Sequence, residues 1–126
     1  MILLDANFLL ELIISGRKHK TKALNYLQNI KENFCVSMLS VHLVLHFGLE
    51  DGLSLDQIKK FLADYPKIAL LPEDYFSALK VLRDKDHEDA MQLVIAKRAG
   101  CSHIVTLDKK FSQTYRDLIE FSVIGN

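Results

Sequence analysis

The chain has 126 residues, of which 49% are hydrophobic and 25% are charged, and its 16 basic and 16 acidic side chains give a formal net charge of zero. This length suits a single domain over residues 1–126 with a real core, and the neutral balance excludes a strongly basic nucleic-acid coat while allowing a local basic rim. No apolar stretch approaches the roughly 18 residues of a membrane helix, and residues 1–5 lack the basic start of a signal peptide. We therefore expect a cytoplasmic protein that does not enter a membrane, with Cys35 and Cys101 as buried reduced thiols.

Short apolar runs alternate along the chain with stretches of helical periodicity. In the first half we expect a strand over residues 1–5, helices over 8–14 and 21–30, a strand over 34–36 and a helix over 37–46. In the second half we expect a helix over 55–63, a strand over 67–71, a helix over 72–83, a helix that residues 86–89 lead into and that ends at Gly100, a strand over 103–107, a helix over 111–115 and a strand over 121–124. Strands that alternate with helices form a parallel sheet covered on both faces. The fold class is therefore α/β, a three-layer α/β/α arrangement around a central parallel sheet of four to five strands.

Several of these helices carry recognisable signals at their ends. Asn7 is a candidate N-cap of the first helix, and Ser54 with Gln57 forms the pattern of a capping box. Pro72 stands at a first helical position, and Gly100 is typical of the residue that follows a last helical turn.

Three aspartates occupy positions that favour convergence in one crevice. Asp5 ends the apolar run 1–4, Asp108 ends the run 104–107, and Asp89 opens an apolar helical stripe. Ligands of open α/β sheets bind just beyond the carboxyl ends of such buried parallel strands. Acids that meet there repel one another, and a hard divalent cation such as Mg²⁺ or Mn²⁺ relieves that repulsion.

Simpler roles are open for each of these acids. A carboxylate after a strand is often a loop residue or a helix cap, and this explanation applies equally to Asp5 and Asp108. Asp86 and Glu88 are explained well by the preference of acids for helix N-termini. Asp89 is explained less well in this way, because it lies directly on the apolar stripe.

Two polar side chains and two lysines adjoin the candidate acids. Thr106 either orients Asp108 or a phosphate, or is a strand residue with a satisfied hydroxyl. Two roles explain Asn7 equally well: a helix cap, and a hydrogen-bond donor that supports the acids. Lys109 and Lys110 directly follow Asp108, where they would be placed to hold a phosphate backbone.

Other conventional sites find little support in the sequence. His42 and His46 have the spacing of a helical metal site but lack an intervening HExxH glutamate, so satisfied or partly exposed histidines are favoured. Ser37 and Ser40 lack a nucleophile elbow, and no glycine-rich nucleotide loop is present. A receiver domain needs an acceptor aspartate after its third strand, where Pro72 instead begins a helix.

Three segments of the chain resemble the motifs of PIN domains. Residues 2–7 (Ile-Leu-Leu-Asp-Ala-Asn) resemble the first motif, and residues 87–93 resemble the motif aromatic-Glu-Asp-Ala-Leu. Residues 99–111 resemble the closing motif, in which Thr-x-Asp precedes a Phe. The order, spacing and length match over essentially the whole chain, and the closest subgroup by length looks like the toxin ribonucleases of bacterial toxin–antitoxin pairs.

The resemblance implies a Mg²⁺- or Mn²⁺-dependent ribonuclease on a compact parallel sheet. In the family, acids bind one or two cations that activate water for attack on a phosphodiester. Carried over, Asp5, Asp89 and Asp108 would be metal ligands, directly or through water, and Asn7 and Thr106 would support them. The implied partners are an RNA substrate, an antitoxin protein and a second copy of the chain in a homodimer.

One position departs from the family pattern. The usual helix glutamate, in a motif such as Ser-x-Leu-x-x-x-Glu, is replaced by Leu43 when Ser37 is aligned with the serine. Three outcomes are open: a weaker site, a site rewired through His46 or through Asp86 as an additional metal ligand, or a pseudo-enzyme.

We therefore expect a metal-dependent endoribonuclease, the toxin of a type II toxin–antitoxin pair. The alternative is a weakened or inactive PIN-like module that binds a protein partner or RNA. The helix over 37–46 is apolar all round, which suits either burial in the core or a partner surface.

Overall fold

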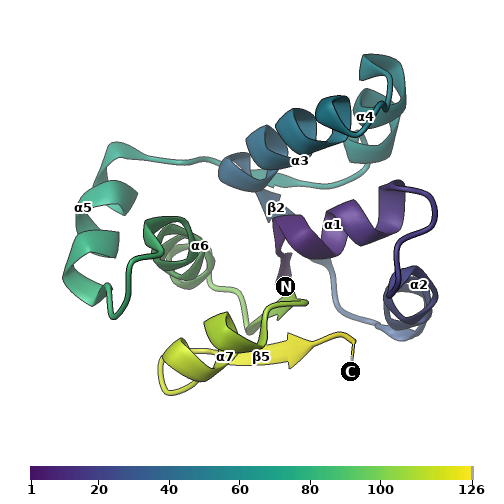
Figure 1. The fold of residues 1–126 in the computed structure, drawn as a ribbon. Helices are drawn as coiled ribbons and strands as arrows, with labels where there is room; N and C mark the ends of the chain where they lie inside the picture. The colour runs from purple at the N-terminus through teal and green to yellow at the C-terminus, as the bar shows by residue number, and fades with distance from the viewer. Residues whose placement is uncertain (126) are drawn as a thin grey trace.

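The computed structural model describes residues 1–125 and contains a sheet of five parallel strands in the order β3-β2-β1-β4-β5. The strands are β1 (Ile2–Leu4), β2 (Phe34–Ser37), β3 (Lys67–Ile68), β4 (His103–Thr106) and β5 (Glu120–Val123). Helices lie on both sides of this sheet (Figure 1). The predicted three-layer α/β/α class with a parallel sheet is confirmed.

The first strand of the chain is the middle strand of the sheet. Ile2, Leu3 and Leu4 are all 0% exposed. Ile2 lies opposite Phe34 of β2 on one side and opposite His103 of β4 on the other. A continuous apolar run suits this central position because both of its faces are covered.

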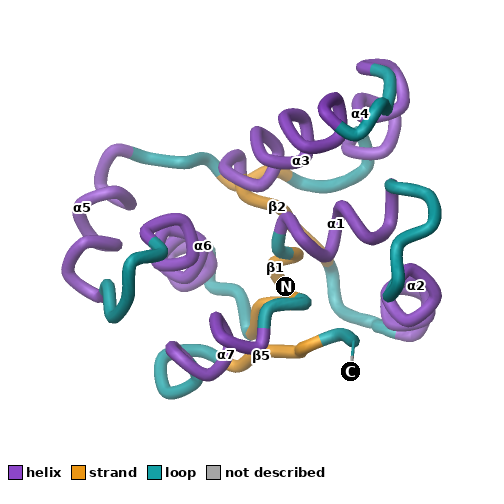
Figure 2. The backbone as a smooth tube through the Cα atoms, viewed as in Figure 1, coloured by secondary structure: helices purple, strands orange, loops and turns teal. Residues whose placement is uncertain are grey.

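Two apolar clusters cover the two faces of the sheet. Successive side chains of a strand point to opposite faces, so Ile2 and Val105 enter one cluster while Leu3 and Ile104 enter the other. The helices of the first cluster are α1 (Ala6–Ile13), α2 (Lys20–Asn29), α3 (Met38–Glu50) and α4 (Leu55–Leu62). The helices of the second cluster are α5 (Pro72–Val81), α6 (His87–Arg98) and α7 (Lys109–Tyr115). Figure 2 shows the orange strands between these two sets of purple helices.

The strongest local signals of the sequence set helix boundaries as predicted. Ser54 and Gln57 form a reciprocal capping box, in which each side chain accepts a hydrogen bond from the other residue's backbone N–H, at 3.1 and 2.8 Å. Pro72 is the first residue of α5, and Gly100 follows α6 with a φ of 75°. A left-handed φ of this kind is cheap for glycine and strained for other residues.

α3 and β3 differ most in length from the sequence prediction. α3 continues beyond His46 to Glu50, so that Gly48 lies inside the helix. A Cβ at Gly48 would lie 2.9 Å from Ile58 Cδ1, which shows that the glycine allows α4 to pack closely. β3 is shorter than predicted and ends at Ile68, because only two of its residues pair with β2.

The two cysteines lie together in the core. Cys35 and Cys101 are free and buried, with their Sγ atoms 3.5 Å apart, as the sequence predicted for reduced thiols. Within residues 1–125, none of the helices combines the length and the apolar character needed to cross a bilayer.

Candidate functional site

Four helices begin near the carboxyl end of the sheet, and each has a polar N-cap. Asp5 and Asp108 follow β1 and β4 and cap α1 and α7, and Ser37, the last residue of the adjacent strand β2, caps α3. Asp86 caps α6 by accepting a hydrogen bond from Asp89 N at 3.0 Å. The chain reversal at each strand end therefore places side-chain oxygens and helix N-termini at one edge of the sheet.

The N-cap of α1 differs from the sequence prediction. Asp5, not Asn7, holds this position, because its Oδ1 accepts a hydrogen bond from Ala6 N at 2.8 Å and the helix begins directly after the strand. Asn7 instead lies in the first turn, which leaves its side chain free for a different contact.

A pocket of about 220 Å³ at this edge contains two of the three candidate aspartates, Asp5 and Asp89. Asp108 is not part of the pocket lining, although its charge acts on both of them. The remaining residues that line the pocket are Ala6, Asn7, Leu10, Leu43, Phe47, Asp86, Glu88 and Gln92.

Asp5 is buried, and both of its carboxyl oxygens accept hydrogen bonds. It is 6% exposed, and its Oδ1 accepts from Ala6 N and from Gln92 Nε2 at 3.1 Å, while Thr106 Oγ1 donates to Oδ2 at 2.7 Å. Burial raises the pKa of Asp5, the hydrogen bonds from Thr106, Gln92 and Ala6 oppose this rise, and the charge of Asp108 adds to it. The donors therefore compensate only part of the cost of burying the charge.

Asp89 carries the clearest electrostatic signature of the site. Its pKa is raised to about 8, first by burial and then by the charges of Asp86, Asp5 and Asp108. A structural helix acid has little reason to be surrounded by three other carboxylates. Perturbed carboxylates of this kind cluster at functional sites, where a cation or substrate supplies the missing positive charge.

Thr106 and Asn7 connect the two strand ends. The Thr106 hydroxyl donates to Asp5 and accepts from Asp108 N at 3.1 Å and from Asn7 Nδ2 at 3.2 Å. Asn7 Oδ1 accepts from Leu107 N at 3.0 Å. Thr106 thus contacts Asp5 directly, and Asn7 contacts Thr106 and the backbone that precedes Asp108.

Sequence reasoning missed Gln92, which lines the pocket and is 2% exposed. It lies one turn after Asp89 on α6, among the apolar residues of that helix. The available signal was a lone amide inside an apolar stripe, since such a group needs partners when it is buried.

The departure from the family pattern also falls in this pocket. Leu43 lines the pocket beside Asp5 and Asp89, so the apolar side chain occupies the wall where the family glutamate is expected. His46 is exposed and lies 3.4 Å from Glu50, outside the pocket lining. Of the two candidates for a rewired site, the structure therefore places Asp86 in the pocket and His46 outside it.

The predicted RNA-binding lysines lie at the start of α7. Lys109 and Lys110 are exposed and directly follow Asp108. Lys110 also lines an open surface hollow beside the N-terminus of α6, together with Asp86 and Glu88. The structure thus leaves both ammonium groups accessible next to the acidic edge.

The donor set fits a hard cation that retains water ligands. Within residues 1–125, no three His, Cys, Asp or Glu side chains lie close enough together to hold a metal ion by themselves. Mg²⁺ is usually held by one or two carboxylates and keeps several waters, a requirement that Asp5 and Asp89 can meet. Asp108 would then act through water or through its charge.

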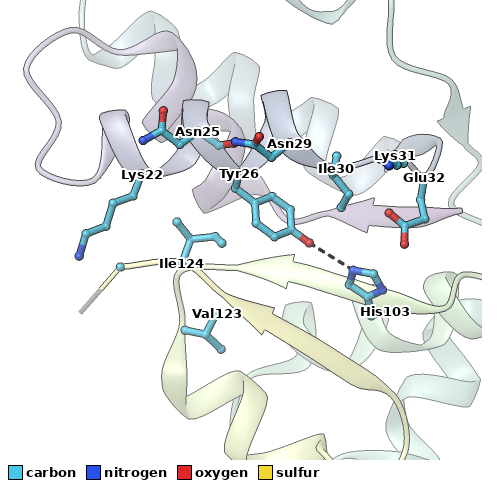
Figure 3. Close-up of a pocket in the computed structure, with 11 residues that line it drawn as sticks. Lys22, Asn25, Tyr26, Asn29, Ile30, Lys31, Glu32, His103, Val123 and Ile124 are labelled. Atoms are coloured by element: carbon cyan, nitrogen blue, oxygen red, sulfur yellow. Dashed lines mark hydrogen bonds between the residues drawn. The ribbon is translucent and has the colours of Figure 1, made fainter.

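A second cavity, of about 750 Å³, lies between α2 and the strands β4 and β5 (Figure 3). Tyr26 points across it towards His103, and their Oη and Nε2 atoms are 3.3 Å apart. Of the described residues that line this cavity, Glu32 is the one acid, and none also lines the pocket around Asp5. It is the roomier cavity, but the smaller pocket holds the perturbed carboxylates.

Comparisons with known proteins agree with this fold. The toxin VapC20 of Mycobacterium tuberculosis, described as cleaving the sarcin-ricin loop, superimposes with a TM-score of 0.78 at 13% identity, over 90% of this chain and 94% of that one. VapBC2 of Rickettsia felis, solved on a promoter DNA fragment, superimposes with a TM-score of 0.73 at 16% identity, over 99% of this chain and 100% of that one. A toxin–antitoxin complex of Klebsiella pneumoniae superimposes with a TM-score of 0.71 at 15% identity, over 98% of this chain and 97% of that one.

The sequence comparison gives the family directly. No curated protein matches the sequence significantly. The family model described as the PIN domain matches residues 2–117, which include all three candidate aspartates. This chain therefore belongs to the PIN domain family.

Proposed function

We propose that this protein is a Mg²⁺- or Mn²⁺-dependent endoribonuclease that hydrolyses phosphodiester bonds, acting as one domain. The observation that carries the proposal is the pocket in which Asp5 and Asp89 meet with Asp108 close by. Asp5 and Asp89, whose pKa values are raised by burial and by the charge of Asp108, gain most from a bound cation. No similar cluster of perturbed acids is found elsewhere in residues 1–125.

In this proposal Asp5 and Asp89 hold the cation directly, and Asp108 acts through water. When bound, Mg²⁺ or Mn²⁺ supplies positive charge that activates water and stabilises the charge developing on the phosphate. Thr106 and Asn7 fix the orientation of Asp5 and of the backbone before Asp108. Asp86 is an additional candidate ligand, since it lines the same pocket.

The exposed lysines complete the proposed substrate surface. Lys109 and Lys110 flank Asp108 and provide positive charge for the RNA backbone beside an acidic pocket. A net charge of zero for the whole chain is compatible with this, because the charges are arranged locally rather than in excess.

We further propose that the protein is the toxin of a toxin–antitoxin pair and that it forms a homodimer in the cytoplasm. Its support is the fold that this chain shares with the toxin VapC20, with the toxin–antitoxin complex of Klebsiella pneumoniae and with VapBC2, which was solved on promoter DNA. The antitoxin would be the protein partner, and RNA would be the substrate.

The first experiment is calorimetric titration of Mn²⁺ into metal-free protein, followed by cleavage of a fluorescent RNA. Wild type is compared with Asp5→Asn and with Asp56→Asn, an exposed acid on α4 that pairs with Lys60 at 3.0 Å. We expect heat and cleavage with wild type and Asp56→Asn, and loss of both with Asp5→Asn. Cleavage by Asp5→Asn at the wild-type rate would refute the proposal.

A second candidate function is a non-catalytic PIN-like module that binds a protein partner or RNA. The observations that favour it are Leu43 in the pocket wall and the exposed apolar side chains of α3, Met38, Phe47 and Leu49, which are 42, 45 and 46% exposed. Absence of Mn²⁺ heat in wild type would favour this function. Gel filtration that shows only monomer, with and without candidate partners, would count against it.

A further inference from the structure

One buried amide in the wall of the pocket needs an explanation. Gln92 lies on α6 between the apolar residues Ala90 and Leu93, both 0% exposed, and is itself 2% exposed. A buried carboxamide costs free energy unless each of its polar atoms has a partner. An apolar residue would satisfy the packing of α6 alone, so packing does not account for an amide at this position.

Gln92 joins three separate segments of the chain through its hydrogen bonds. Its Nε2 donates to Asp5 Oδ1 at 3.1 Å and to Ser40 Oγ at 2.6 Å, and its Oε1 accepts from Ser37 Oγ. These partners lie at the end of β1, in the first turn of α3 and at the end of β2. Both amide protons and the carbonyl oxygen are thereby used.

The hydrogen bonds of Ser37 agree with this orientation of the amide. Its hydroxyl oxygen accepts a hydrogen bond from Ser40 N at 3.0 Å, so its proton is free to be donated to Gln92 Oε1. The amide nitrogen then faces Asp5, whose Oδ1 accepts from Gln92 Nε2 as it does from Ala6 N. The hydrogen bonds at the start of α3 thus agree with an amide nitrogen that meets the acid.

We propose that Gln92 is a positioning residue of the candidate metal site, which holds the Asp5 carboxylate at a fixed distance from Asp89. This inference rests on the proposed function, because it concerns the same pair of acids. Gln92 and Asp89 lie one turn apart on the same rigid helix, so a hydrogen bond from Gln92 to Asp5 connects the two ligands through the backbone of α6.

The neutral amide suits this role in a pocket crowded with acids. It supplies a donor to Asp5 without adding to the repulsion among the carboxylates. With Leu43 in the wall where a glutamate is expected, Gln92 and Thr106 are the side chains that fix the two oxygens of Asp5. Partners that orient a ligand in this way typically change metal affinity about 10- to 100-fold when they are removed.

The test compares Gln92→Met with Ser40→Ala in the full chain by calorimetric titration of Mn²⁺, well below the melting temperature of each variant. Methionine keeps the length of the side chain and removes its hydrogen bonds. Ser40→Ala removes one hydrogen bond of the same network but leaves the contact between Gln92 and Asp5. If the hydrogen-bond network of Gln92 served folding alone, both variants would melt at a lower temperature than wild type and would bind Mn²⁺ with wild-type affinity.

We expect Gln92→Met to bind Mn²⁺ at least about tenfold more weakly than wild type, and Ser40→Ala to bind within about twofold of it. Wild-type affinity in a folded Gln92→Met variant would overturn the inference. An equal loss of affinity in both variants would also overturn it, because the effect would then follow the network rather than the contact with Asp5.

A measurement without metal separates this inference from the proposed function and also covers a variant that fails to fold. In wild type, NMR should find the side-chain amide protons of Gln92 exchanging slowly with solvent. Exchange should accelerate in Asp5→Ala and stay slow in Glu88→Gln, an exposed acid of the same pocket. Absence of Mn²⁺ binding by wild type would refute the proposed function alone, whereas fast exchange in wild type would refute the role of Gln92.

Discussion

Replacement of Asp89 by asparagine should stabilise the metal-free protein while it removes metal binding. Asp89 has a pKa of about 8, raised by burial and by the charges of Asp86, Asp5 and Asp108. The folded state therefore holds a proton that the unfolded state releases near the ordinary value of 3.8. The stability associated with this protonation is fully present below about pH 4 and is lost as the pH rises towards 8.

The magnitude follows from the same difference in pKa. At about 1.4 kcal/mol for each unit of pKa, the full difference gives an upper bound of about 6 kcal/mol. Asp89 is only partly buried, and solvent screening reduces this to roughly 1–2 kcal/mol. The interaction of the Asp89 charge with the N-terminus of α6 opposes the gain by about 0.5 kcal/mol. We expect a net gain of about 1 kcal/mol for Asp89→Asn at about pH 8.

The assay is urea denaturation of both proteins in EDTA at about pH 5 and about pH 8. The advantage of Asp89→Asn should grow with pH. In Mn²⁺ at 100 times its dissociation constant the order should reverse, because wild type gains about 2.7 kcal/mol from binding. A variant that is less stable than wild type at pH 8 without metal would refute the reasoning.

Three further substitutions test other parts of the structure. Leu43→Glu should add a carboxylate to the pocket wall, strengthen Mn²⁺ binding about tenfold by calorimetry and lower metal-free stability; unchanged affinity would show that position 43 does not reach the cation. Arg98→Ala should lower the free energy of unfolding by roughly 2 kcal/mol, because Asp74, 1% exposed, loses the partner that lies 2.9 Å away. Arg83→Ala, which breaks the exposed ion pair with Asp117, should lower the free energy of unfolding clearly less than Arg98→Ala does in the same urea series.

The order of elements was predictable because apolar periodicity and helix caps are local. Ser54 and Pro72 act within a few residues of their own position, so their effect can be read from the sequence. The end of β3 at Ile68 could not be read from the sequence, since it depends on where β2 ceases to offer a pairing partner. The N-cap of α1 was also missed, because Asp5 and Asn7 are equally good caps by residue type and tertiary contacts decide between them.

Some residues of the candidate site could likewise be predicted from the sequence, and one could not. Asp5 and Asp108 could be found because each follows a buried strand, and parallel strands bring their carboxyl ends together. Gln92 could not be found, since its partners at Asp5, Ser37 and Ser40 lie 87, 55 and 52 residues away. A sequence pattern marks which acids can converge, but not which neutral side chain orients them.

The central position of β1 has a consequence for the chain during its synthesis. Asp5 is made 101 residues before Thr106, the last residue of β4, and β4 is the strand that pairs with β1 on the side away from β2. Until that segment emerges, the hydroxyl that holds Asp5 is missing and Asp108 does not yet exist. For a protein proposed to cut RNA, this order of assembly keeps a growing chain incomplete while it is still attached to its own message.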